Sequence, residues 1–292
     1  MAKAACYGLG LEVARRVAPY VMAFGVAYGE EGVTLRRWTD KPILVMSPVW
    51  TADDVARYKL TPCVQDVSDV ARLAGLRAPC GVHIKLNTGM NRYGVPGIQA
   101  LREVIAAIEA NPLLTIEGAC THYAGDASFA RQNRRLLPML TVLPRGICIH
   151  TEASPTAYRG GFDAVRVGLG AYRDSVRIES RVLSVHHVAE GERVGYDGIY
   201  TVERTQYIAV IAGGYADGLA KALRGHLVSI RGALYPIVAV CMDVCMVAMD
   251  RACAVGDAVV VLGEGPDPVG LSLYEMYTGL HGRCAFAYRG EE

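Results

Sequence analysis

The sequence lacks an excess of charge of either sign. Its 30 lysines and arginines are balanced by 29 aspartates and glutamates, which leaves a formal net charge of +1. A chain without a strong overall field does not attract nucleic acid or an anionic membrane by bulk electrostatics. We therefore expect its partners to be small molecules or a second copy of the chain.

Long apolar runs are also missing. The longest hydrophobic stretch, residues 235–249, is interrupted by Asp243, so it falls short of a membrane span. Met1 leads at once to Lys3 and Gly8, without the apolar centre of a secretory signal. These absences predict a cytoplasmic protein that binds no membrane.

The nine cysteines show no pairing pattern. Their number is odd, and Cys241 and Cys245 have no second His or Cys pair at zinc spacing. We expect buried reduced thiols, as in cytosolic proteins, and no metal site. No internal repeat or low-complexity segment is visible, and the 52% of hydrophobic residues can build a sizeable core.

The first part of the chain alternates short apolar runs with helical periods, which is typical of βαβ units and a parallel sheet. The predicted strands are residues 21–27, 43–46, 62–64, 82–86, 115–119, 147–150 and 164–167. The predicted helices are residues 30–38, 51–58, 68–76, 97–110 and 127–140. With a stub at residues 1–3 the strand count reaches eight, which predicts a (β/α)8 TIM-like barrel with a truncated first strand.

The pattern changes near residues 172–181. Beyond this point short β-branched runs follow each other closely, with glycine-containing turns between them. The sequence therefore predicts an α/β barrel over residues 1–176 and a mostly-β C-terminal domain over residues 177–292.

Several candidate functional residues follow the predicted barrel strands, at the end where such barrels carry their active sites. They are Lys3, Tyr7, Lys85, Arg92, His122, Ser154 and Arg166. Ser154 and the glycines Gly168 and Gly170 follow the last two strands, where this fold favours a phosphate. Each residue alone has an ordinary alternative: a frayed terminal lysine, a turn or cap residue, a structural histidine or an ion-paired arginine.

The order of motifs resembles that of alanine racemases, which are fold-type III enzymes that use pyridoxal phosphate (PLP). Residues 3–8 (KAACYG) resemble the family's lysine motif, and residues 82–92 (VHIKLNTGMNR) resemble its H-x-K-x-[DN]-T-G-M-x-R motif. Residues 214–218 (GYADG) and 241–243 (CMD) follow in family order. The resemblance covers nearly the whole chain.

This resemblance implies a role for each candidate around PLP. Lys3 would hold PLP as a Schiff base and act as one catalytic base, and Tyr196 of the partner subunit would be the base on the opposite face. Arg166 would face the pyridine nitrogen, and His122 would lie beside the ring. The phosphate would be held by Tyr7, Ser154, Gly168 and Leu169.

The substrate side is implied in the same way. Arg92 and the backbone N–H of Met242 would hold the substrate carboxylate, and Arg92 would also contact the PLP hydroxyl oxygen. Lys85 is often carbamylated in the family, which would make it an anion that orients Arg92, and an uncharged or ion-paired lysine stays the alternative. Tyr215 would line the substrate corridor, and Asp243 would support the loop that carries Met242.

Three departures from the family pattern are visible. The family has about one more strand and helix before the lysine motif, so we expect an upstream start or a frayed first strand. The C-terminal stretch has Gly282 where a phosphate-contacting tyrosine is expected. Ala239 and Lys221 replace arginines of the outer corridor, which could shift the preference from alanine toward another small amino acid such as serine.

The resemblance implies a homodimeric PLP-dependent alanine racemase that supplies D-alanine for peptidoglycan. Two alternatives stay open: a PLP enzyme of different specificity, and a non-catalytic or degenerate PLP-binding protein. An acidic partner for the ring nitrogen, expected in a decarboxylase, is replaced by Arg166.

Overall fold

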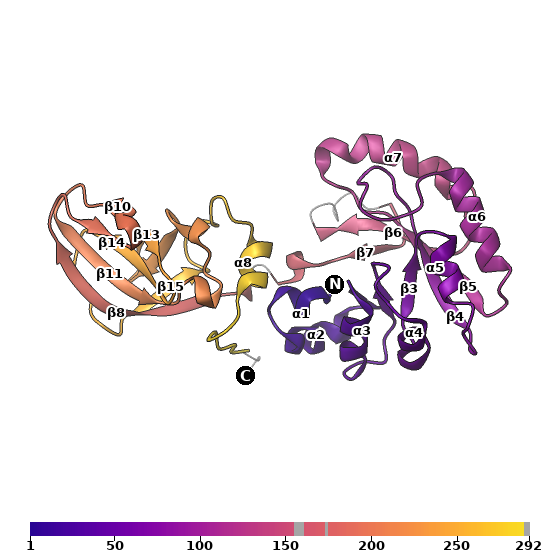
Figure 1. The fold of residues 1–292 in the computed structure, drawn as a ribbon, viewed down its shortest axis with the longest axis horizontal. Coiled ribbons are helices and arrows are strands. Elements are labelled where there is room, and N and C mark those ends of the chain that lie inside the picture. The colour runs from indigo at the N-terminus through magenta and orange to yellow at the C-terminus, as the bar shows by residue number, and fades with distance from the viewer. Residues whose placement is uncertain (155–160, 173–174, 289–292) are drawn as a thin grey trace. The chain divides into compact units, whose positions relative to one another are not determined.

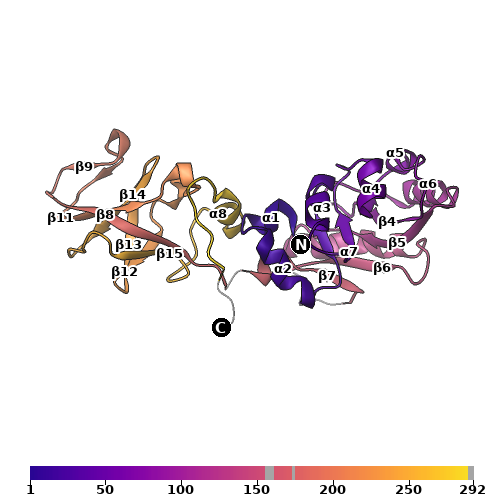
Figure 2. The same ribbon diagram turned by 90° about the horizontal axis from the view of Figure 1, so that it is seen from below.

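The computed structural model describes residues 1–154, 161–172 and 175–288, and Figures 1 and 2 show its elements in two views. The chain forms two compact units. The N-terminal unit comprises Met1–Cys6 and Gly10–Ala171, and the C-terminal unit comprises Tyr7–Leu9 and Tyr172–Glu292. The short segment Tyr7–Leu9 therefore packs with the second unit although it belongs to the lysine motif.

The N-terminal unit is built on a parallel sheet of seven strands in sequence order. The strands are β1 (Phe24–Val26), β2 (Ile43–Val45), β3 (Thr61–Val64), β4 (Cys80–Lys85), β5 (Leu114–Cys120), β6 (Cys148–Ala153) and β7 (Ala164–Arg166). Every predicted strand is present, with ends shifted by no more than three residues. Strands such as β1 and β3 are buried almost throughout, as expected for a sheet covered on both faces.

The gap between the first and last strands is bridged by the beginning of the chain. The amide of Ala2 donates to the carbonyl of Gly25 in β1 at 2.8 Å, and the ammonium of Met1 donates to the carbonyl of Val167, just after β7, at 2.6 Å. The result is a nearly closed barrel whose eighth strand is reduced to a stub. The predicted fold class, including the truncated first strand, is confirmed.

Helices cover the outside of these strands in Figures 1 and 2. The five predicted ones are α3 (Gly29–Arg36), α4 (Ala52–Tyr58), α5 (Val67–Arg72), α6 (Ile98–Glu109) and α7 (Asp126–Leu140), and α2 (Leu11–Val17) is additional. Local caps fix their starts: Thr51 Oγ1 accepts from the amide of Asp54, and Asp66 Oδ1 accepts from the amide of Asp69. Their apolar sides, including Leu35, pack onto the barrel.

The turn that follows the stub, α1 (Lys3–Tyr7), has an unusual backbone. Ala4, Ala5, Cys6 and Tyr7 all have left-handed φ values, between 49° and 61°. Each such residue costs roughly 1–2 kcal/mol when it is not glycine, so surrounding contacts must hold this turn. Lys3 therefore lies at the junction between a strand stub and a strained turn.

The C-terminal unit is antiparallel and mostly β, as predicted. Six strands close into a barrel in the order β11-β14-β13-β12-β15-β8. They are β8 (Ile178–Val188), β11 (Gln206–Ala212), β12 (Leu227–Ile230), β13 (Ala233–Val240), β14 (Val244–Met249) and β15 (Ala258–Leu262). A small ladder joins β9 (Arg193–Val194) to β10 (Tyr200–Thr201), and one helix, α8 (Leu273–Gly279), was not expected from the sequence.

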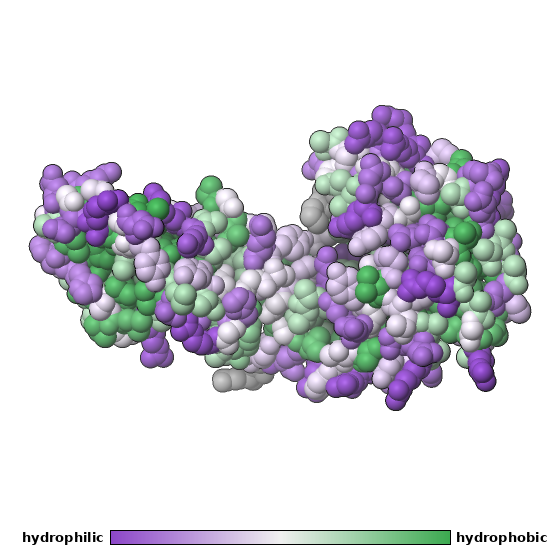
Figure 3. All heavy atoms as spheres, in the orientation of Figure 1, coloured by the Kyte–Doolittle hydropathy of each residue, from purple (hydrophilic) through white to green (hydrophobic). Residues whose placement is uncertain are grey.

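The surface mixes hydrophilic and hydrophobic residues. Figure 3 shows mostly hydrophilic residues on the visible face of the N-terminal unit, with hydrophobic ones scattered among them, which is a normal surface. In the part of the chain that the structure describes, no helix combines the length and apolar character needed to cross a membrane.

Candidate active site

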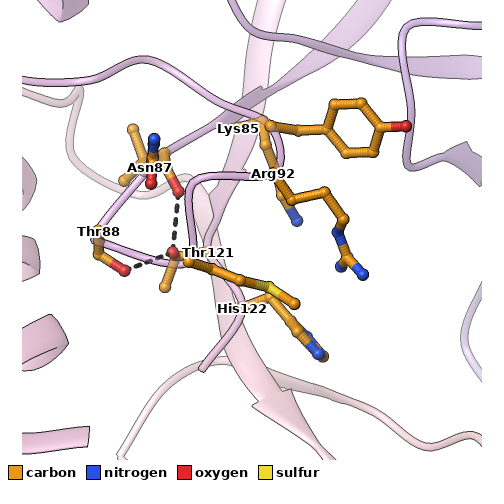
Figure 4. Close-up of a pocket in the computed structure, with 9 residues that line it drawn as sticks. Lys85, Asn87, Thr88, Arg92, Thr121 and His122 are labelled. Carbon is orange, nitrogen blue, oxygen red and sulfur yellow. Dashed lines mark hydrogen bonds between the residues drawn. The ribbon is translucent and has the colours of Figure 1, made fainter. Parts of the chain in front are cut away.

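A small hollow lies where β4 and β5 end and the following loops begin. Figure 4 shows Lys85, Arg92 and His122 directing their nitrogen atoms toward the same side of it. The lining residues are Lys85, Leu86, Asn87, Thr88, Met90, Arg92, Tyr93, Thr121 and His122. The two loops are tied together, because Thr88 and Thr121 share a hydrogen bond of 2.8 Å and Thr121 donates to the carbonyl of Leu86.

The amine of Lys3 lies within electrostatic reach of this hollow. Burial lowers the pKa of Lys3, and the positive charges of Arg92 and Lys85 lower it further, while Glu31 raises it. A lysine with a lowered pKa has a larger neutral fraction near pH 7, which is the form that attacks a carbonyl. Lys3 thus has the electrostatic setting of a nucleophilic amine.

His122 experiences the same set of cations. Burial is the main reason why its pKa falls to about 3, and Arg166, Lys85, Arg92 and Lys3 lower it further. The imidazole is therefore neutral near pH 7. A flat neutral ring beside a group of cations suits contact with an aromatic ligand that carries negative charge.

The cations themselves need anions. Lys85 is 6% exposed, and among the described residues no carboxylate forms an ion pair with it. Its side chain is hydrogen-bonded to the buried thiol of Cys120, and a bound anion in the hollow would further stabilise the positive charges of Lys85 and Arg92. The carboxylate of an amino acid is such an anion, so the residues present fit an amino-acid ligand by charge.

Arg166, at the end of β7, is rigidly held. Its Nη2 donates to the carbonyl oxygens of Thr121 at 2.6 Å and Thr151 at 3.0 Å, and its Nη1 donates to Nδ1 of His150 at 2.6 Å. The two neighbouring strands, β5 and β6, therefore fix the plane of the guanidinium. Such an arginine can present a fixed positive charge without giving up a proton.

Two histidines that the sequence analysis left without roles lie behind Arg166. Because a guanidinium only donates, Nδ1 of His150 accepts, and Nε2 of His150 then donates to Nδ1 of His83 at 2.8 Å. Burial first and Arg166 second lower the pKa of His150 to about 2 and that of His83 to about 4. Both rings are neutral near pH 7. The hydrogen bond from Arg166 fixes the tautomer of His150, which carries its proton on Nε2.

This histidine pair depends on a glycine in the neighbouring strand. A Cβ atom on Gly118 would lie 2.3 Å from Cε1 of His83 and 2.5 Å from the carbonyl of Cys148. We therefore expect Gly118→Ala to lower the free energy of unfolding by about 1–3 kcal/mol in urea titrations. Gly75→Ala, with no atom within 4 Å of its added Cβ, is the control and should change stability little. Equal stability of both variants would contradict the close packing of His83.

The predicted phosphate residues of the N-terminal unit lie together. The hydroxyl oxygen of Ser154 accepts from the amides of Gly168 at 2.9 Å and Gly170 at 3.2 Å. A Cβ on Gly170 would come within 2.9 Å of the Ser154 Cβ, so the absence of a side chain permits the approach. Leu169 is buried between the two glycines. The cluster thus gathers a hydroxyl and two backbone amides, which bond to each other, after β6 and β7.

Tyr7 belongs to the C-terminal unit, where it is buried. Its ring contacts Tyr274 edge-on, with centroids 5.5 Å apart, and Tyr172 at 6.2 Å. The end of the described chain reaches the same segment, because the Tyr288 hydroxyl donates to the carbonyl of Leu9 at 2.7 Å. A tyrosine was expected at Gly282, which has no side chain. Tyr288 instead brings an aromatic hydroxyl to the Tyr7–Leu9 segment.

The remaining predicted residues lie in turns of the C-terminal unit. Tyr196 begins a short 3-10 turn and is 58% exposed, and Met242 is also exposed, in the turn between β13 and β14. The Lys221 ammonium lies 5.3 Å from the ring centroid of Tyr215. Asp243 pairs with Arg283 at 2.9 Å, and Arg283 forms a bidentate pair with Asp217 at 2.8 Å.

These geometries define a class of protein. A nearly closed parallel barrel carries a lysine of lowered pKa and a group of cations at the carboxyl ends of its strands, and it is followed by an antiparallel β-barrel domain. Family models agree on both parts: the alanine racemase N-terminal domain matches residues 1–176, and the alanine racemase C-terminal domain matches residues 175–288. The chain belongs to the alanine racemase family and is an amino-acid racemase by membership.

Individual relatives support this assignment. The chain is 31% identical to the alanine racemase of Geobacillus stearothermophilus, over 91% of this chain and 78% of that protein. It is 30% identical to alanine racemase 1 of Bacillus subtilis, over 83% and 70%. Among solved structures, alanine racemase from E. faecalis has a TM-score of 0.84 at 27% identity, covering 96% of this chain and 88% of that one. The biosynthetic alanine racemase from Pseudomonas aeruginosa has the same fold, with a TM-score of 0.89 at 24% identity over 99% and 91%.

Proposed function

We propose that this protein interconverts L-alanine and D-alanine with PLP as its cofactor. The observation that carries the proposal is Lys3, an amine with a lowered pKa at the mouth of a barrel that gathers Arg92, Lys85 and Arg166. When bound, PLP supplies an electron sink that acidifies the α-proton of an amino acid. Membership of the alanine racemase family points to alanine as the substrate.

The chain's residues divide the work of binding. Ser154, the amides of Gly168 and Leu169, and Tyr7 would hold the phosphate. Arg166 would contact the pyridine nitrogen, and because the guanidinium keeps its protons the ring would stay a modest electron sink, which favours a simple exchange of the α-proton. His122 would pack beside the ring.

A second group of residues would orient the substrate. Arg92 and the backbone N–H of Met242 would hold the carboxylate, which fixes the α-carbon between the two bases. Lys85 has no carboxylate partner among the described residues, and carbamylation would turn it into the anion that orients Arg92. Tyr215 would line the path of the substrate, and Asp243 would steady the turn that carries Met242.

Racemisation requires bases on opposite faces of the α-carbon. Lys3 would serve one face and Tyr196 the other. Tyr196 is largely exposed on the C-terminal domain, residues 177–292, so it is available to a partner subunit. We therefore propose a homodimer in which each C-terminal domain completes the site of the other barrel. The D-alanine formed in the cytoplasm would supply peptidoglycan synthesis.

Borohydride reduction tests the cofactor assignment. The purified full-length protein is loaded with PLP, reduced and digested, and we expect a pyridoxyl group on the peptide that contains Lys3. The same preparation is then offered a panel of L-amino acids and assayed for D-products, with D-alanine expected as the main one. Absence of the adduct on Lys3 would refute the enzyme assignment, and faster formation of D-serine would reassign the substrate.

A further inference from the structure

Glu31, a residue without an assigned role, holds the strained turn next to Lys3. Its Oε1 accepts from the amide of Ala4, the residue after the lysine, at 2.6 Å. Its Oε2 accepts from the amides of Ala27 at 2.7 Å and Tyr28 at 3.1 Å. One carboxylate thus ties the left-handed turn to the junction between β1 and α3.

These contacts exceed what a helix cap needs. Glu31 is the third residue of α3, and its bond to the amide of Tyr28 belongs to an ordinary capping box. The bond to Ala4 is different, because it reaches 27 residues back to the lysine motif. Charge-assisted hydrogen bonds of this kind are about twice as strong as neutral ones, so they can offset part of the cost of the left-handed backbone.

The charge of Glu31 also acts on the amine. Among the described residues, Lys3 interacts electrostatically with Arg92, Lys85, Glu31, His122 and the ammonium of Met1. Of these, Glu31 is the acid, and it opposes the cations that would otherwise lower the pKa of Lys3 still further. Its carboxylate therefore links the geometry of the turn to the protonation of the lysine.

We propose that Glu31 is the positioning residue of Lys3: it anchors the turn that aims the lysine and supplies the negative charge that balances the cations around its amine. The inference rests on the proposed function in that Lys3 is the PLP-binding lysine. It adds a residue through which the protein sets both the orientation and the basicity of that lysine.

The test measures the titration of Lys3 in the full-length protein after removal of PLP. Acetylation of the Lys3 peptide is followed by mass spectrometry as a function of pH. We expect Glu31→Gln to move the midpoint to lower pH, because the charge that raises the pKa is lost. Glu31→Ala should in addition weaken PLP binding about tenfold, in line with the loss of other orienting partners. If Glu31→Ala fails to fold by circular dichroism, Glu31→Gln carries the test alone.

Two matched variants separate this role from general effects. Glu30→Gln removes one charge from an exposed neighbour on the same helix, and Glu275→Gln removes the acid of the capping box of α8, in which Glu275 accepts from the amide of Ser272 at 2.9 Å. Both should leave the Lys3 midpoint unchanged. A midpoint that stays in place in Glu31→Gln, or moves equally in Glu30→Gln, would overturn the inference. Since neither PLP nor substrate is present, this outcome is independent of whether borohydride labels Lys3.

Discussion

Replacement of Lys3 by alanine should abolish both covalent PLP binding and racemisation. The residue is proposed to act as nucleophile toward the cofactor and as base toward the α-carbon, and a positioned base alone contributes about 10²–10⁴-fold. We therefore expect the rate of D-alanine formation to fall by roughly four orders of magnitude. Chiral chromatography of the product and borohydride mapping of the adduct measure the two effects separately.

Two further variants make the result specific to this amine. Lys3→Arg keeps a positive charge beside Arg92 and Lys85 but cannot form the covalent bond, so it should be as inactive as Lys3→Ala. Lys59→Arg changes an exposed lysine that caps α4 and should keep full activity and labelling. Racemisation by Lys3→Ala at more than a tenth of the original rate would show that another group is the base.

The barrel could be predicted from the sequence because its signal is periodic and local. Parallel strands buried on both faces read as short apolar runs, and β1 and β3 are of this kind. The helix α8 was missed although Ser272 and Glu275 form a capping box that the sequence displays. A seven-residue helix in an all-β domain has too little periodicity to stand out.

The backbone at the lysine motif could not be predicted. Ala4, Ala5 and Cys6 carry no turn signature, and a left-handed conformation is unfavourable for each of them. Tertiary contacts impose it, above all the bond from the amide of Ala4 to Glu31. An interaction between residues 27 apart leaves no pattern in a single sequence.

The residues around Arg166 illustrate a similar limit. His83 and His150 are 67 residues apart, and only the pairing of β4, β5 and β6 brings Nδ1 of His83 to 2.8 Å from Nε2 of His150. A signal existed: His83 and Lys85 alternate along β4, and both are buried on the inside of the barrel. Because residues two apart in a strand face the same side, this spacing could have predicted that His83 lies near Lys85. It could not have predicted that His83 bonds to His150, the partner of Arg166.

Tyr196→Phe should separate the two faces of the reaction. Without the phenol, only Lys3 can move the α-proton, so one enantiomer of alanine should still exchange its α-proton in deuterated water while the other does not. We expect the overall racemisation rate to fall about 10²–10⁴-fold, the usual contribution of a positioned base. Proton NMR follows the exchange. Tyr20→Phe, at a tyrosine that is 87% exposed, should behave like the unchanged protein. Equal exchange of both enantiomers by Tyr196→Phe would contradict a two-base mechanism.

Co-expression of Lys3→Ala with Tyr196→Phe tests whether the tyrosine comes from the partner subunit. Random pairing gives mixed dimers in about half of the molecules, and each would contain one site with both bases intact and one with neither. The mixture should therefore recover about a quarter of the original activity per subunit, although each variant alone is nearly inactive. If Tyr196 instead served its own subunit, no dimer would contain a complete site, and the mixture would stay as inactive as its components.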